Sequence, residues 1–93
     1  MLEKDIIAGI KAYLKTVPNC FYWKNHGGRF GQGGLPDVCC CIAGRFAAFE
    51  VKTDKGRVTV LQQVTLRRIR AAGGIAEVVR SVDEVKEIVQ RLG

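Results

Sequence analysis

Residues 34–52 read GLPDVCCCIAGRFAAFEVK and contain the clearest strand signals of the chain. Two apolar runs rich in β-formers, 38–42 and 46–51, flank the short segment 43–45, which contains a glycine. Such runs on either side of a short glycine-containing segment are typical of two adjacent strands. The sequence therefore predicts a β-hairpin.

The register of this hairpin brings charged residues together. A two-residue turn pairs Ile42 with Arg45, a four-residue turn gives the same register, and continuing the ladder outward places Asp37 opposite Glu50. Cross-strand partners have Cβ atoms about 4.5–5.5 Å apart, and residues two apart share a face of the sheet, so Lys52 joins the two acids.

This trio suits phosphodiester hydrolysis. Two close carboxylates repel each other unless a cation lies between them, and hard oxygen ligands favour Mg²⁺ or Mn²⁺ over zinc. Such an ion holds a scissile phosphate and lowers the pKa of a bound water, while Lys52 orients that water or stabilises the transition state. The plainer alternative is a turn-capping Asp37 and a surface pair between Glu50 and Lys52.

Several segments together resemble the VRR-NUC domain of the PD-(D/E)xK nuclease superfamily: GLPD at 34–37, EVK at 50–52, Gly56, Thr59, Gln62, AGG at 72–74 and VRS at 79–81. The superfamily motif alone is short and degenerate, but the glutamine and the VRS segment make the match more specific. The resemblance covers nearly the whole chain. It implies an α/β, restriction-endonuclease-like α-β-β-β-α-β-α core, with a mixed sheet flanked by helices in one domain, 1–93.

The resemblance also implies the site. The metal, Mg²⁺ or Mn²⁺, is expected on Asp37, Glu50 and the carbonyl of Val51, and the catalytic residues are Asp37, Glu50, Lys52 and Gln62. Stand-alone phage or bacterial members are similar to Holliday junction resolvases and tend to be homodimers, which implies branched DNA as substrate and a homodimer.

Two of the site residues have alternative roles. Glu3 stands at the start of a predicted helix, where a carboxylate is favoured by the helix dipole. The family resemblance instead suggests that it reaches the metal, directly or through water, with Asp5 as the runner-up. Gln62 has the spacing of a capping box with Thr59, and capping alone explains it as fully as a contact in the active site does.

The net charge of +6 favours a polyanionic partner such as nucleic acid. Basic residues flank the elements around the acidic site and are candidates for gripping phosphates on either side of the cut. The DNA-binding candidates are Lys24, His26, Arg29, Arg57 and Arg67. For His26, the single histidine, a loop hydrogen bond competes with a phosphate contact or a proton-transfer role.

Other features exclude whole classes of function. The apolar runs fall short of the roughly 18 residues that cross a bilayer, and no secretory pattern is present, so we expect an intracellular, cytoplasmic protein without membrane contact. The glycine-rich segment 27–34 lacks the P-loop pattern, which argues against a nucleotide cofactor. The cysteines, with 39–41 consecutive and no CxxC spacing, are expected to be buried, reduced thiols.

The remaining elements follow from periodicity and capping signals. We expect a helix over about 2–16, a strand at 21–23 begun by Cys20, a helix from Thr59 to about Ala72, a strand at 75–79 and a last helix capped by Ser81. Trp23 is expected to lie in the core rather than to form a base-stacking platform.

The leading hypothesis is a metal-dependent, structure-selective DNA endonuclease that cuts branched DNA such as Holliday junctions. The alternative is a catalytically silent nucleic-acid-binding or assembly module with a nuclease fold. Nothing in the sequence reports a reader of the ribose 2′-hydroxyl, so RNA stays open as a substrate.

Overall fold

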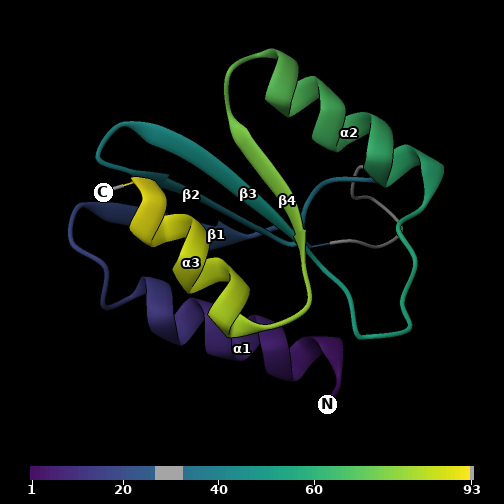
Figure 1. Ribbon diagram of the computed structural model, residues 1–93, viewed down its shortest axis with the longest axis horizontal. Coiled ribbons are helices and arrows are strands. Elements are labelled where there is room, and N and C mark those ends of the chain that lie inside the picture. Colours follow the sequence, from purple (N-terminus) through teal and green to yellow (C-terminus); the bar gives the residue numbers. More distant parts are fainter. Residues whose placement is uncertain (27–32, 93) are drawn as a thin grey trace.

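The computed structural model describes residues 1–26 and 33–92, whose elements follow the order α-β-β-β-α-β-α (Figure 1). They are α1 (Glu3–Leu14), β1 (Cys20–Lys24), β2 (Val38–Ile42), β3 (Arg45–Val51), α2 (Val60–Ala71), β4 (Ile75–Val79) and α3 (Val82–Leu92). The strands form one sheet in the order β1-β2-β3-β4, antiparallel except for the parallel pair β3 and β4. The predicted α/β fold with a mixed sheet is confirmed.

Helices cover both faces of this sheet, as apolar strands require. Figure 1 shows α1 and α3 side by side on one face and α2 beside β4 on the other. The main core lies between the sheet and the α1–α3 layer, where the fully buried side chains include Ile10, Leu14, Phe49, Val79 and Val85. Of the residues described, none belongs to a helix long and apolar enough to cross a membrane.

The predicted hairpin register is confirmed. Ile42 pairs with Arg45, and the ladder runs outward to Val38 opposite Phe49. Both residues between the strands, 43 and 44, have positive φ, at 50° and 84°. Such a turn twists the backbone in the sense that the two strands need. Asp37 and Glu50, the next residues outward, are therefore opposite each other.

The helix boundaries lie close to those expected from the sequence. The first helix spans Glu3–Leu14, shorter than the predicted 2–16 because residues just beyond Leu14 form a turn. The Asp5 carboxylate accepts the Leu2 N–H at 3.1 Å, so Asp5 caps this helix. Ser81 caps α3 by accepting the Glu84 N–H at 3.2 Å.

The expectation that Trp23 belongs to the core is wrong. Trp23 is 38% exposed and Phe21 is 71% exposed, because they point to the sheet face on which α2 packs against β4 and leaves β1 uncovered. Phe21 and Trp23 have ring centroids 5.9 Å apart, and Trp23 lies 6.3 Å from Phe46. We call these three residues the aromatic patch.

The cysteines are all free, but their burial differs from the expectation. Cys39 and Cys40 are buried, whereas Cys20 and Cys41 are half-buried. Burial raises the pKa of the Cys40 thiol to about 12 and also raises the pKa of Cys39. Both thiols therefore stay protonated, which makes them poor nucleophiles.

Candidate active site

Asp37 is held at the end of the sheet by both neighbouring strands. Its Oδ2 accepts the backbone N–H of Val51 at 2.8 Å, and its carbonyl accepts the N–H of Asn25 at 2.9 Å. The Asn25 amide also donates to the carbonyl of Pro36 at 2.8 Å. These bonds fix the side chain of Asp37 beside β3 without help from a ligand.

Glu50 is a buried acid whose two carboxylate oxygens differ in their polar contacts. The residue is 2% exposed. Its Oε2 accepts a hydrogen bond from Nε2 of Gln62 at 3.3 Å and lies 3.7 Å from the ammonium of Lys52. Its Oε1 is buried and has no hydrogen-bond partner among the residues that the structure describes. An unsatisfied buried oxygen is costly and calls for a compensating group.

The surroundings of Glu50 disfavour its negative charge. Burial, and after it the neighbouring Asp37 carboxyl group, raise the pKa of Glu50 to about 8. Lys52 opposes this shift, while Glu3 makes a small contribution in the same direction as Asp37. The positive charge of Lys52 does not offset the combined effect of burial and the neighbouring acids on the pKa of Glu50.

Gln62 makes the predicted capping contacts and also contacts a candidate site residue, Glu50. Its Oε1 accepts the Thr59 N–H at 2.9 Å, and its own N–H donates to Thr59 Oγ1 at 3.1 Å, which completes the predicted capping box. Its Nε2 meanwhile reaches Glu50. The capping geometry thus aims the amide at the acid, so one side chain begins α2 and lines the site.

Lys52 follows β3 directly and keeps its backbone on the sheet. Its N–H donates to the carbonyl of Val79 at 3.0 Å, which extends the parallel ladder by one bond. The side chain is 12% exposed, so most of its stem is covered by protein. Its ammonium is thereby restricted to the neighbourhood of Glu50.

These groups fit a hard divalent cation. Asp37 and Glu50 offer carboxylate oxygens, one of which has no hydrogen-bond partner among the described residues, and the backbone of Val51 lies beside Asp37, to which its N–H donates. In the stretches 1–26 and 33–92, no three His, Cys, Asp or Glu side chains form a metal-binding cluster. Glu3, half-buried at the start of α1, therefore does not join the two acids as a third close side chain.

The DNA-binding candidates are more scattered. His26, Arg57 and Arg67 are exposed, whereas Lys24 is half-buried and donates to the carbonyl of Asn25 at 3.3 Å. Arg29 lies outside the described residues. The structure brings none of the four described candidates into hydrogen-bond contact with the acidic site.

Sequence reasoning missed Asn25 and Arg80. Asn25 supports the GLPD segment from 11 residues away, and Arg80 donates to the turn that follows Lys52. Both act on backbone carbonyls. Side-chain patterns carry no signal for such contacts, although the VRS segment did place Arg80 among the residues of the family resemblance.

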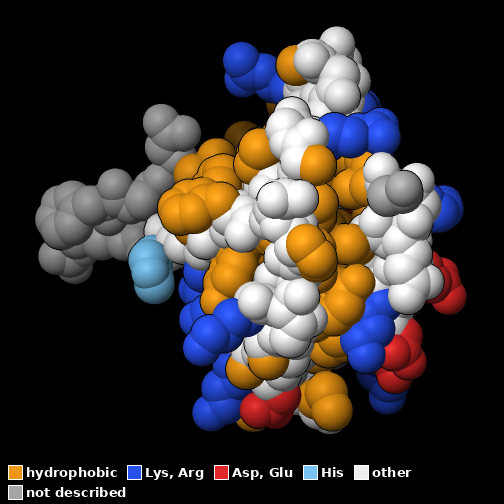
Figure 2. All heavy atoms as spheres, turned by 90° about the vertical axis from the view of Figure 1, so that its left-hand side faces the viewer, with side chains coloured by type: hydrophobic (Ala, Val, Ile, Leu, Met, Phe, Trp, Pro, Cys, Tyr) orange, Lys and Arg blue, Asp and Glu red, His pale blue; other side chains and the backbone are white. Residues whose placement is uncertain are grey.

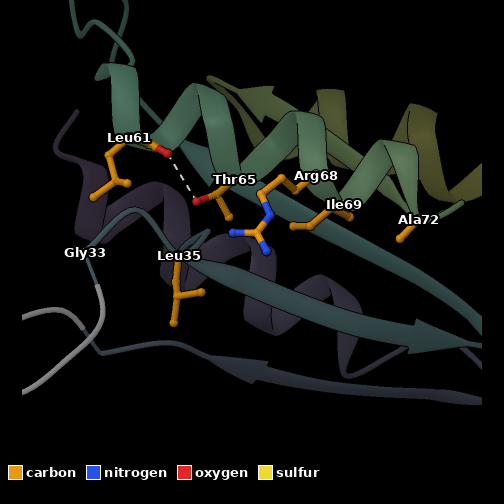
Figure 3. Close-up of a pocket in the computed structure, with 7 residues that line it drawn as sticks. All are labelled: Gly33, Leu35, Leu61, Thr65, Arg68, Ile69 and Ala72. Atoms are coloured by element: carbon orange, nitrogen blue, oxygen red, sulfur yellow. Dashed lines mark hydrogen bonds between the residues drawn. The ribbon is translucent and has the colours of Figure 1, made fainter.

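A groove of about 650 Å³ lies beside the site, between the segment before β2 and α2 (Figure 3). Figure 3 shows the Arg68 side chain reaching from α2 across this groove. Gly34 adopts a φ of +88° where the chain passes close to Leu61 of α2. The lining residues are Gly33, Leu35, Leu61, Thr65, Arg68, Ile69 and Ala72.

Comparisons with known proteins give one informative match. No protein-family model matches the sequence, and neither does any curated protein. A solved structure described as "VRR_NUC domain" aligns with a TM-score of 0.76 and 21% sequence identity, covering 95% of this chain and 94% of the other. The alignment thus extends over nearly all of both chains, and the protein has the fold of a VRR-NUC domain.

Proposed function

We propose that this protein is a metal-dependent endonuclease that hydrolyses phosphodiester bonds in DNA. The observation that carries the proposal is the buried Glu50 with its unpartnered oxygen, next to Asp37, Lys52 and Gln62 at one end of the sheet. The similarity to a VRR-NUC domain supports a nuclease fold for this arrangement. We propose Mg²⁺ or Mn²⁺ as the cofactor because the available donors are hard oxygens.

Each residue then has a defined task. Asp37, Glu50 and the Val51 carbonyl would hold the cation, which would supply Lewis-acid charge to the phosphate and lower the pKa of a bound water. Lys52 places a positive charge beside the reacting phosphate, where preorganised charge favours the transition state. Gln62 holds the Glu50 carboxylate in position. Exposed His26, Arg57 and Arg67, with Lys24, grip the DNA backbone.

We further propose that the substrate is branched DNA, such as a Holliday junction, and that two copies of the chain act together in the cytoplasm of a bacterium or a phage-infected host. A four-way junction has two symmetry-related positions for cleavage, and a dimer with two active sites would match them. The aromatic patch supports the dimer, because exposed aromatic rings in contact with one another are enriched at protein interfaces. Figure 2 shows hydrophobic side chains in the middle of one side of the molecule, with Lys and Arg above and below.

Cleavage of labelled DNA tests the proposed activity. Four-way junction, flap and linear duplex of matched sequence are incubated with Mg²⁺, Mn²⁺ or EDTA. We expect metal-dependent cleavage with preference for the junction. Lys52→Ala should lower the rate by at least about 100-fold because it removes a charge at the reacting phosphate. Lys11→Ala, which removes an exposed lysine from the last turn of α1, is the matched control and should cleave normally.

Two results would contradict the proposal. Binding of every substrate without cleavage would favour the silent nucleic-acid-binding module. Full activity in Lys52→Ala would show that the site lies elsewhere. A matched single-stranded RNA in the same assay decides whether ribose is accepted.

A further inference from the structure

Arg80 lies beside Lys52 at the end of the parallel pair of strands. The ladder of β3 and β4 ends with Val51 opposite Val79, and the Lys52 N–H still donates to the Val79 carbonyl at 3.0 Å. One step further along this ladder, Arg80 is the neighbour of Lys52. Paired residues of a sheet share a face, so the backbone directs both side chains to the same side.

The guanidinium of Arg80 binds the turn that follows Lys52. Its Nη1 donates to the carbonyl of Thr53 and, at 3.0 Å, to the carbonyl of Gly56. The Gly56 N–H closes the same turn by donating to the Thr53 carbonyl at 3.0 Å. Hydrogen bonds from a charged donor are about twice as strong as neutral ones. One side chain therefore holds both ends of a four-residue turn.

This turn packs on the stem of Lys52. A Cβ added at Gly56 would lie 3.3 Å from Cβ of Lys52 and 3.4 Å from its Cδ, so the glycine backbone sits directly against the methylene groups. With the stem covered on that side, the ammonium is directed towards Glu50, 3.7 Å away. Movement of the turn would release the stem.

Arg80 is itself fixed by the start of α3. Its backbone N–H donates to a carboxylate oxygen of Glu84 at 3.0 Å, and the Glu84 N–H donates to Ser81 Oγ. The capped first turn of α3 thus fixes Arg80, and Arg80 in turn fixes the turn at residues 53–56. The contacts run without a gap from α3 through Arg80 and residues 53–56 to Lys52.

We infer that Arg80 is a positioning residue for Lys52: by clamping the 53–56 turn, it holds the Lys52 ammonium beside Glu50. This inference rests on the proposed nuclease function. Arg80 itself touches neither Glu50 nor Asp37 in the hydrogen bonds of the described residues, so its effect on catalysis passes through the turn.

Single-turnover cleavage of the junction by Arg80→Met provides the test. We expect the rate at saturating protein to fall about 10- to 100-fold, because small displacements of a catalytic group cost this much. The protein concentration needed for half-maximal rate should change less than about 2-fold. Arg91→Met, which removes an exposed arginine from the last turn of α3, is the control and should behave as wild type.

A second measurement reads the turn directly. Hydrogen exchange of the Gly56 amide, which closes the turn, should accelerate in Arg80→Met, and NMR relaxation of the Lys52 side chain should show greater mobility. If Arg80→Met fails to fold, Gly56→Ala replaces it: the added methyl group would lie 3.3 Å from Cβ of Lys52, so the turn or the lysine stem must shift by a few tenths of an ångström while Arg80 stays, and we expect the rate to fall.

The outcomes separate the inference from the proposed function. If the wild type does not cleave, the nuclease proposal fails, and the Gly56 and Lys52 NMR measurements still decide whether Arg80 restrains the lysine. If the wild type cleaves and Arg80→Met cleaves at the same rate, the inference is wrong. The inference would also be wrong if Arg80→Met needed a higher protein concentration for half-maximal rate but kept the same rate at saturating protein. That result would indicate that Arg80 contacts DNA.

Discussion

At the scale of single residues, Glu50 is a buried acid whose charge the fold disfavours and the proposed cation would need. A buried carboxylate with an unpartnered oxygen destabilises the metal-free fold, and a bound cation would remove that cost. The pKa of Glu50 is about 8 in the folded protein, against an ordinary value of 4.5. Between these pH values the folded state holds a proton that the unfolded state has lost. The metal-free protein should therefore lose stability as the pH rises from about 4.5 to 8, with no further loss above.

The Glu50→Gln variant tests this conflict because it removes the charge and keeps the shape. In EDTA at pH 9 we expect it to melt at least about 5 °C above the wild type, with the difference shrinking towards pH 5. Adding Mg²⁺ should stabilise the wild type and leave the variant unchanged. Thermal melts over this pH range, with exposed Glu87→Gln as control, give the answer. A wild type that is equally stable at pH 5 and pH 9 in EDTA would contradict the assigned pKa.

The pairing of Asp37 and Glu50 was predictable from the sequence, because the register of a hairpin follows by counting residues outward from its turn. Sequence reasoning did not predict the contacts of Asn25 or Arg80. Apart from Cys39 Sγ, to which Asn25 also donates, the partners of these side chains are backbone carbonyls whose positions depend on the path of the loops, and no periodicity reports that path.

At the scale of elements, Gly34 sets the distance between the loop before β2 and α2. Its positive φ excludes most side chains, and a Cβ there would lie 2.6 Å from Cγ of Leu61 and 3.2 Å from the Leu61 carbonyl oxygen. Gly44, at the hairpin turn, also has a positive φ, but a Cβ there would meet nothing within 4 Å. A side chain at Gly44 would therefore meet backbone strain alone, whereas one at Gly34 would meet backbone strain and close contacts with α2.

Alanine substitution at the two positions should therefore give unequal costs. We expect Gly44→Ala to lower the free energy of unfolding by about 1–2 kcal/mol through backbone strain alone. Gly34→Ala should cost about 1–3 kcal/mol more, because the methyl group must also displace α2. Urea unfolding of both variants measures the difference. Equal losses would mean that α2 yields freely at Leu61.

Among the elements, α2 and β4 were predictable because a capping box and a buried strand between glycine and serine leave strong local signals. The exposure of β1 was not. Its run of three aromatic residues has no alternation of polar and apolar side chains, so nothing in the strand indicates which face another layer covers.

At the scale of the whole molecule, the aromatic patch belongs to the same sheet face as the site. Trp23 pairs with Cys39, which is two residues from Asp37, and Cys39 pairs with Ala48, which is two residues from Glu50. A partner that covered the patch would therefore be placed next to the acids. This arrangement connects the proposed dimer to the proposed activity.

Replacing Trp23 with arginine should prevent the proposed dimer, because a charge would be buried at its centre. We expect light scattering after size exclusion to give the mass of two chains for the wild type and of one chain for Trp23→Arg. Ala8→Arg, on the exposed side of α1 in the opposite layer, is the control and should keep the wild-type mass. Wild-type protein with the mass of one chain would refute the dimer.

The double use of the Gln62 amide has a consequence for how the proposed activity would respond to heating. Helix ends fray before the body of a fold melts. Fraying of α2 at Thr59 would free the Gln62 oxygen and withdraw its nitrogen from Glu50 in the same motion. Loss of the proposed nuclease activity is then expected to follow the opening of one helical turn, at temperatures where the sheet and its core are still intact.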